Sequence, residues 1–213
     1  MGYSEAWPGG ATPFHMADRL LVLLDAWGLD RVALVGLDMG GQPALAFAAR
    51  HPNRVSHLVV MNSLEQWDEA TSWEIRVLRR FGWNRFILRR LPTAVFRRAE
   101  RTFLPAGLQL PPDLRADFWT AFRRSEVRAF IAKMCAGYQG TLPRLAKLYS
   151  TITAPTLVFW AGRDKHFPVV HAERLHAAIP GSVLEVLDGA EHWMPWYCAD
   201  EVANRIDAFL TRV

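Results

Sequence analysis

The chain has 213 residues and a mass of 24.2 kDa, with 51% hydrophobic residues, 22% charged residues and a mean hydropathy of +0.01. This composition excludes a disordered chain. No apolar run approaches the ~18 residues that a membrane-spanning helix needs, and two cysteines are too few for a disulfide scaffold. The net charge of +4 is uneven, since nine arginines lie between Arg76 and Arg101 against the single acid Glu100, so a nucleic-acid surface over the whole protein is not indicated.

Helical and strand periods alternate over the first sixty residues. Residues 12–28 have apolar side chains at helical spacing, with Thr12 as a cap, and residues 31–37 are an apolar run typical of a strand covered on both faces. A small-residue helix over 40–51 and a second buried strand over 55–61 follow. This alternation predicts a parallel sheet flanked by helices.

The pattern then changes, because residues 63–149 contain arginine-rich and tryptophan-rich helical stretches separated by prolines, Pro143 among them, and no convincing strand. The alternation returns with strands over 155–161 and 183–187 and helices over 169–179 and 200–210. We therefore expect an α/β core in two parts, residues 1–63 and 150–213, with an all-helical cap over residues 64–149. The arginines are interpreted as a solvated face of the cap, with an anion or membrane-surface role as the alternative.

One junction between a strand and a helix resembles a nucleophile elbow. Gly36 and Gly40 flank Asp38 two residues on either side, as in the G-x-S-x-G turn, but with aspartate at the nucleophile position. The start of the following helix favours the ionised carboxylate there, and the backbone N–H of Met39 is the expected oxyanion donor.

An aspartate nucleophile narrows the reaction class. Its attack on an acyl carbonyl gives an anhydride, a poor intermediate, whereas attack on a carbon that bears a leaving group gives an ester that activated water can cleave. The expected base is His192, which follows the last strand, oriented by Asp164, which follows the strand before it. Glu65 and Asp68 are the alternative acids.

These three turns, in this order, resemble the α/β-hydrolase family, and the aspartate at the elbow resembles its epoxide hydrolase and haloalkane dehalogenase branch. The resemblance runs over residues 1–63 and 152–213, and the insertion stands where that family has its cap. It implies an α/β-hydrolase fold in which Asp38 is the nucleophile, Asp164 the acid and His192 the base.

Two further residues bear on the leaving group. Tyr138 stands where the epoxide hydrolases have a cap tyrosine that protonates the opening oxygen, and Trp193 is expected to line an apolar substrate pocket. The related dehalogenases have tryptophan beside the nucleophile, where this chain has Met39, which cannot donate a side-chain hydrogen bond. The comparison favours an epoxide.

The strands and the H-G-x-P-type loop that this family has before the elbow are not found, so the chain resembles an N-terminally truncated member. Without a neighbour, the strand over 31–37 is expected to be an apolar exposed edge. We hypothesise that the true start lies upstream; a short form that dimerises and a degenerate relic are the alternatives.

Together these inferences predict a soluble, cytoplasmic hydrolase that acts on a small, apolar electrophile through an alkyl-enzyme ester on Asp38. The expected reaction is epoxide hydrolysis. Haloalkane dehalogenation, a non-catalytic binding module and an esterase relative that lost its serine are the alternatives. The chemistry requires no metal or organic cofactor. The expected partners are the substrate and, as one option, a second copy of the chain, with neither nucleic acid nor membrane.

Overall fold

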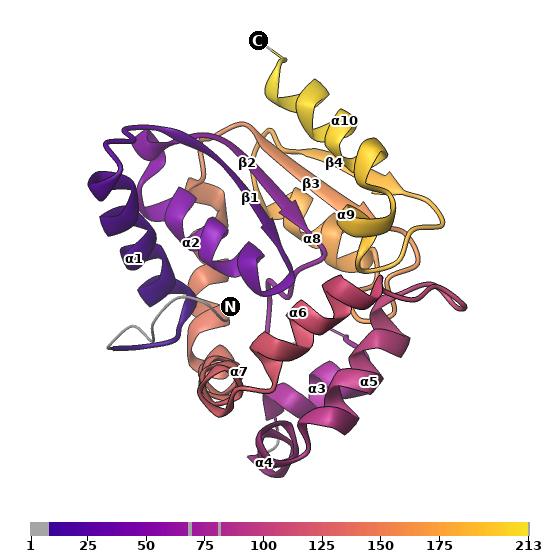
Figure 1. Ribbon diagram of the computed structural model, residues 1–213. Helices are drawn as coiled ribbons and strands as arrows, with labels where there is room; N and C mark the ends of the chain where they lie inside the picture. The colour runs from indigo at the N-terminus through magenta and orange to yellow at the C-terminus, as the bar shows by residue number, and fades with distance from the viewer. Residues whose placement is uncertain (1–8, 68–69, 81, 213) are drawn as a thin grey trace.

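The computed structural model describes residues 9–67, 70–80 and 82–212. Four parallel strands form one sheet in the order β1 (Val32–Leu37), β2 (Val55–Met61), β3 (Thr156–Ala161) and β4 (Val183–Leu187). Because all strands run the same way, their carboxyl ends meet at one edge of the sheet, where the cap helices lie (Figure 1). The expected parallel α/β architecture is therefore confirmed.

Helices cover both faces of the sheet. On one face lie α1 (Pro13–Ala26), α2 (Gly41–Arg50) and α8 (Val170–Ala178), and on the other lie the short α9 (Met194–Tyr197) and α10 (Ala199–Leu210). The side chain of Thr12 accepts a hydrogen bond from the backbone N–H of His15 at 3.3 Å, so the predicted cap of α1 is confirmed.

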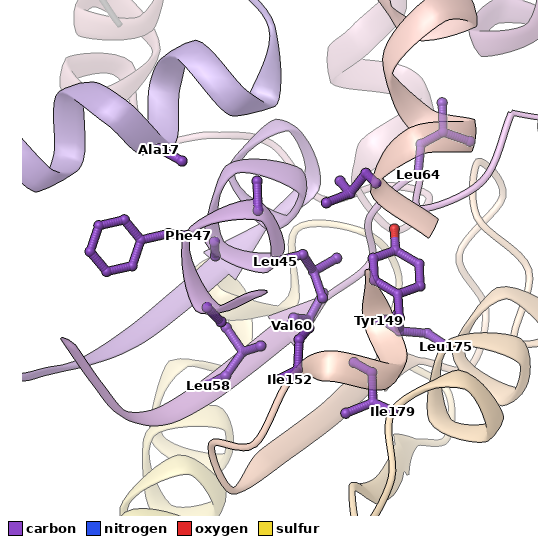
Figure 2. Packing of buried hydrophobic residues seen from close by; sticks show 14 of the residues in the cluster. Ala17, Leu45, Phe47, Leu58, Val60, Leu64, Tyr149, Ile152, Leu175 and Ile179 are labelled. Carbon is purple, nitrogen blue, oxygen red and sulfur yellow. The ribbon is translucent and has the colours of Figure 1, made fainter. Parts of the chain in front are cut away.

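The larger part of the core lies between α2 and the sheet. Figure 2 shows Leu45 of α2 near Leu58 and Val60 of β2, with Ile152 and Leu175 farther along the same layer. These side chains are buried and come from segments that are far apart in sequence, so their burial fixes the sheet against its helices.

Strand β1 differs from the expectation of a strand covered on both faces. Its residues alternate between more and less exposed, and Val35 is 50% exposed. Within the described residues β1 pairs only with β2, so it forms an edge of the sheet, as expected from the sequence.

Between β2 and β3 the described residues form helices and no strand. They are α3 (Trp73–Arg80), α4 (Gly82–Arg90), α5 (Pro92–Phe103), α6 (Pro112–Phe122) and α7 (Ser125–Ala146). Pro143, expected to separate helices, lies inside the last turn of α7, because burial of Leu142 and Leu145 holds that turn against the core. None of the helices in the described ranges is long and apolar enough to cross a membrane.

Candidate active site

The turn after β1 has the strained geometry that the sequence predicts. Asp38 has a φ of +50°, which is unusual for a residue other than glycine, and a 3₁₀ turn leads from it into α2. The hydroxyl of Ser63 donates to the backbone carbonyl of Asp38 at 2.7 Å and helps to hold the turn.

Two glycines make this turn sterically feasible. A Cβ atom on Gly36 would lie 2.6 Å from the carbonyl oxygen of Gly40, and one on Gly41 would lie 2.4 Å from Oγ of Ser63. Gly40 itself has open space at its Cβ position and a φ of −87°. The close contacts therefore involve Gly36 and Gly41, whereas the sequence motif pointed to Gly36 and Gly40.

The loops after β3 and β4 bring Asp164 and His192 together. Nδ1 of His192 lies 2.7 Å from Oδ2 of Asp164, and both side chains are buried. The other oxygen, Oδ1, accepts the backbone N–H groups of His166 at 2.7 Å and Phe167 at 3.0 Å. The carboxylate is therefore fixed on both sides, and it orients the imidazole ring.

Asn62 is a further member of this group that the sequence analysis missed. Its Nδ2 donates to Oδ2 of Asp164 at 2.7 Å, and its Oδ1 accepts from the backbone N–H of Ala161 at 3.1 Å. Asn62 is fully buried and has a φ of +38°. The available signal was its position directly after β2, level with the strand end that precedes Asp164.

The alternative acids do not take this place. Glu65 is fully buried and lies 3.5 Å from Nδ1 of His171, while Asp68 lies outside the described residues. The carboxylate on His192 is therefore that of Asp164, as the order of the motifs predicts.

On the other side of the ring, Nε2 of His192 lies 3.8 Å from Oδ2 of Asp38 and has no hydrogen-bond partner. Burial alone would lower the pKa of His192, but the carboxylates of Asp164 and Asp38 outweigh it and raise the pKa to about 9. At neutral pH the ring is therefore an imidazolium between two acids.

Asp38 opens into a cavity of about 590 Å³ between the core and the cap. Met39, Tyr138 and Trp193 line it, as do aromatic side chains of the cap helices α5 and α6. Burial raises the pKa of Tyr138 well above its usual value, so its hydroxyl stays protonated. The structure thus brings all six expected site residues together, while their roles remain predictions.

Phe103, at the end of α5, joins the cap to this site. Its ring lies 4.8 Å from that of His192 and 5.3 Å from that of Trp193, measured between centroids, and its carbonyl accepts the backbone N–H of Trp193 at 3.2 Å. The cavity wall next to the imidazolium is therefore aromatic.

Comparison with known proteins places this geometry in a family. The pattern of the alpha/beta hydrolase fold matches residues 1–197. The chain is 30% identical over 224 residues to the 2-hydroxy-6-oxononadienedioate/2-hydroxy-6-oxononatrienedioate hydrolase 1 of Dechloromonas aromatica, and similarly to its counterpart in Paraburkholderia xenovorans. Each alignment covers 99% of this chain and 73% of the relative.

Solved structures agree on the fold. A thermophilic esterase from Thermogutta terrifontis superimposes with a TM-score of 0.79 at 24% identity, covering 99% of this chain and 76% of that one. A 2-hydroxy-6-oxo-6-phenylhexa-2,4-dienoate hydrolase from a Rhodococcus species gives 0.78 at 20% identity, covering 99% and 75%. At these identities the likeness concerns the fold alone.

The relatives correct the expected reaction. Epoxide hydrolysis through an alkyl-enzyme ester, with haloalkane dehalogenation or a non-catalytic module as alternatives, is wrong, because the relatives similar in sequence are named as hydrolases, and their named substrates are oxo acids that have neither an epoxide nor a halogen. The aspartate at the elbow is a single residue, whereas the similarity to hydrolases of another substrate class runs along 99% of the chain.

Proposed function

Because the chain belongs to the alpha/beta hydrolase fold family, we propose that it is a hydrolase that adds water to the oxo group of a largely apolar ketone and breaks the adjacent carbon–carbon bond. The observation that carries this proposal is the pair of Asp38 and His192, 3.8 Å apart at one end of an apolar cavity. The names of the relatives supply the substrate class, since 2-hydroxy-6-oxononadienedioate contains no ester, amide or anhydride to hydrolyse.

Asp38 acts in this proposal as a general base. Direct attack of its carboxylate on the oxo carbon, followed by cleavage, would leave a mixed anhydride on the protein, which is a poor intermediate. A separation of 3.8 Å lets one water molecule lie about 2.8 Å from both Oδ2 of Asp38 and Nε2 of His192. Asp38 then takes a proton from this water as its oxygen bonds to the oxo carbon.

The negative charge that develops on the oxo oxygen needs donors. The backbone N–H of Met39, at the start of the turn, and the protonated hydroxyl of Tyr138 are the groups that we assign to it. Trp193 and the aromatic side chains of the cap hold the apolar body of the substrate.

His192 supplies the second proton. When the carbon–carbon bond breaks, its electron pair goes to the leaving carbon, which takes the proton from the imidazolium, and the oxo carbon becomes a carboxylic acid. The proton held by Asp38 then returns to His192, so the site is restored and one water has been consumed. The pKa of about 9 supports this role, because it keeps His192 protonated at neutral pH.

The test is turnover of 2-hydroxy-6-oxo-6-phenylhexa-2,4-dienoate by the full chain, with benzoate measured by chromatography. We expect Asp38→Ala and His192→Ala to reduce the rate by about 10²–10⁴-fold. Asp207→Asn, an exposed carboxylate on α10, is the matched control and retains the rate. Undiminished turnover in Asp38→Ala, or cleavage of simple esters without any of the ketone, would contradict the proposal.

Labelled water tests for a covalent intermediate that is opened at the carbonyl of Asp38. In a single turnover with protein in excess, direct addition of water places one heavy oxygen in every benzoate. Unlabelled oxygen delivered from the carboxylate of Asp38 into benzoate would show a covalent intermediate and rule out the general-base role.

A further inference from the structure

His166 is a second histidine in the cavity, and the proposed reaction does not use it. It lies two residues after Asp164, is only 1% exposed and lines the same cavity as Asp38. Its Nε2 atom is buried without a hydrogen-bond partner. A buried polar atom in this state is costly, and in a cavity it indicates a group that a ligand satisfies.

The other ring nitrogen of His166 is held by the cap. Nδ1 lies 2.7 Å from Oγ of Ser72, and the backbone N–H of Ser72 donates to the carbonyl of His166 at 3.3 Å. Oγ of Ser72 also accepts the backbone N–H of Ile75 at 3.4 Å, at the start of α3. The orientation of the ring is therefore fixed from outside the cavity.

An ion pair within the cap lies beside Ser72. Glu74 is ion-paired with Arg98, whose Nε lies 2.9 Å from Oε1. Burial of Glu74 opposes its ionisation, but the hydrogen bond and the positive charge of Arg98 lower its pKa. The segment that holds Ser72 against Nδ1 of His166 is therefore anchored within the cap.

His166 also stays neutral. Burial and the positive charge of His192 lower its pKa, and together they outweigh the carboxylates of Asp164, Glu74 and Asp38. In either tautomer of the neutral ring, Nε2 can pair with a hydroxyl group, which both donates and accepts. Gln42 presents an unpaired acceptor in the same wall, because its Nε2 donates to the carbonyl of Leu64 at 2.9 Å while its buried Oε1 has no partner.

We propose that Nε2 of His166 forms a hydrogen bond with a hydroxyl group of the substrate, which makes His166 a residue that determines specificity. The inference rests on the proposed function and names the substrate class more closely, as a ketone that also carries an enol or alcohol O–H. The rings of His166 and His192 lie 5.9 Å apart between centroids, and Phe103 packs on both. The hydroxyl therefore binds beside the reaction centre.

The test compares two ligands that differ only in this hydroxyl: 2-hydroxy-6-oxo-6-phenylhexa-2,4-dienoate and its analogue with hydrogen at carbon 2. Dissociation constants are measured by calorimetry in the Asp38→Ala background, where turnover does not interfere. We expect the hydroxy compound to bind about fivefold to tenfold more tightly, as one buried hydrogen bond gives. His166→Phe abolishes the preference, and His166→Gln, which offers an amide oxygen, keeps part of it.

A preference that survives in His166→Phe, or that is absent when His166 is intact, overturns the inference. Neither result concerns the proposed function, which is judged by turnover of the unmodified chain. If neither ligand binds and the unmodified chain does not turn over the ketone, the proposed function fails and the role of His166 falls with it. Thermal unfolding of each variant shows whether a loss of preference reflects a loss of fold.

Discussion

Asp38 and Asp164 approach His192 from opposite ring nitrogens, at 3.8 Å from Nε2 and 2.7 Å from Nδ1. Burial alone would favour the neutral imidazole, but each carboxylate stabilises the imidazolium, so the two together keep the buried ring protonated. A serine at position 38 would leave only one acid beside the ring. The residue at the elbow thus decides whether His192 is a proton donor or a base in the resting site.

This charge balance predicts the effect of Asp38→Asn on His192. With one of the two carboxylates neutralised, the pKa of His192 falls from about 9 by roughly one unit or more. Titration of the imidazole by nuclear magnetic resonance measures the shift. Asp207→Asn is the control and leaves the midpoint unchanged; an unchanged midpoint in Asp38→Asn would show that Asp38 does not interact with the ring.

Substitution of Asn62 is expected to reduce both the turnover rate and the free energy of unfolding. Asn62→Ala removes the hydrogen bond to Asp164, leaves the backbone N–H of Ala161 unpaired in the core and puts a Cβ-bearing residue without polar groups at a φ of +38°. We expect about 10–100-fold slower turnover, as for other residues that orient a functional side chain, and a loss of about 1–3 kcal/mol in the free energy of unfolding. Asn204→Ala, on the exposed side of α10, changes neither. A normal turnover rate in Asn62→Ala would show that Asn62 does not position the functional side chains.

At the scale of elements, the turn between β1 and α2 depends on two close backbone approaches. In Gly36→Ala the new methyl group lies 2.6 Å from the carbonyl oxygen of Gly40, and in Gly41→Ala it lies 2.4 Å from Oγ of Ser63. Each substitution is expected to reduce the free energy of unfolding by about 1–3 kcal/mol. Gly40→Ala has open space and an ordinary φ, so it is neutral or slightly stabilising. Urea unfolding measures all three; equal effects would mean that the turn tolerates side chains uniformly.

The same elements show how far the sequence determines the fold and the site. Runs of apolar residues located the four strands, and the order of the three turns located Asp38, Asp164 and His192, because chemistry in such sheets collects at the carboxyl ends of strands. The exposure of β1 and the helical state of Pro143 depend on neighbours in space, which a local pattern does not contain. Asn62 was missed for the same reason.

The comparison with relatives shows that the residue at the elbow does not determine the substrate class. One aspartate at the elbow suggested an epoxide, but similarity along 99% of the chain pointed to hydrolases of oxo acids. A single side chain constrains the first chemical step, whereas the substrate is selected by the whole cavity. In this chain most of the cavity wall comes from helices of the cap, whose sequence has no motif of its own.

At the scale of the whole molecule, hydrogen bonds between cap and core converge on the site. The backbone of Ser72 bonds that of His166, and the carbonyl of Phe103 accepts from Trp193. Both core partners lie on the loops that carry Asp164 and His192. Placement of the cap is therefore coupled to the geometry of the two loops, and a cap that shifts also moves the proton donor.

The buried imidazolium makes the stability of the molecule depend on pH. The pKa of His192 rises from an ordinary 6.5 to about 9 on folding, so its contribution, on the order of 3 kcal/mol, is complete below pH 6.5 and is lost as the pH rises through about 9. The contribution of Asp164 to stability depends on pH in the opposite direction. Although burial opposes its ionisation, its hydrogen bonds to His192 and to the backbone lower its pKa, so its contribution to the free energy of unfolding is lost only in acid. We expect urea unfolding to give a larger free energy at pH 6 than at pH 9.5. His192→Gln removes the titrating group and most of this difference; an equal difference in that variant would place the pH dependence elsewhere in the molecule.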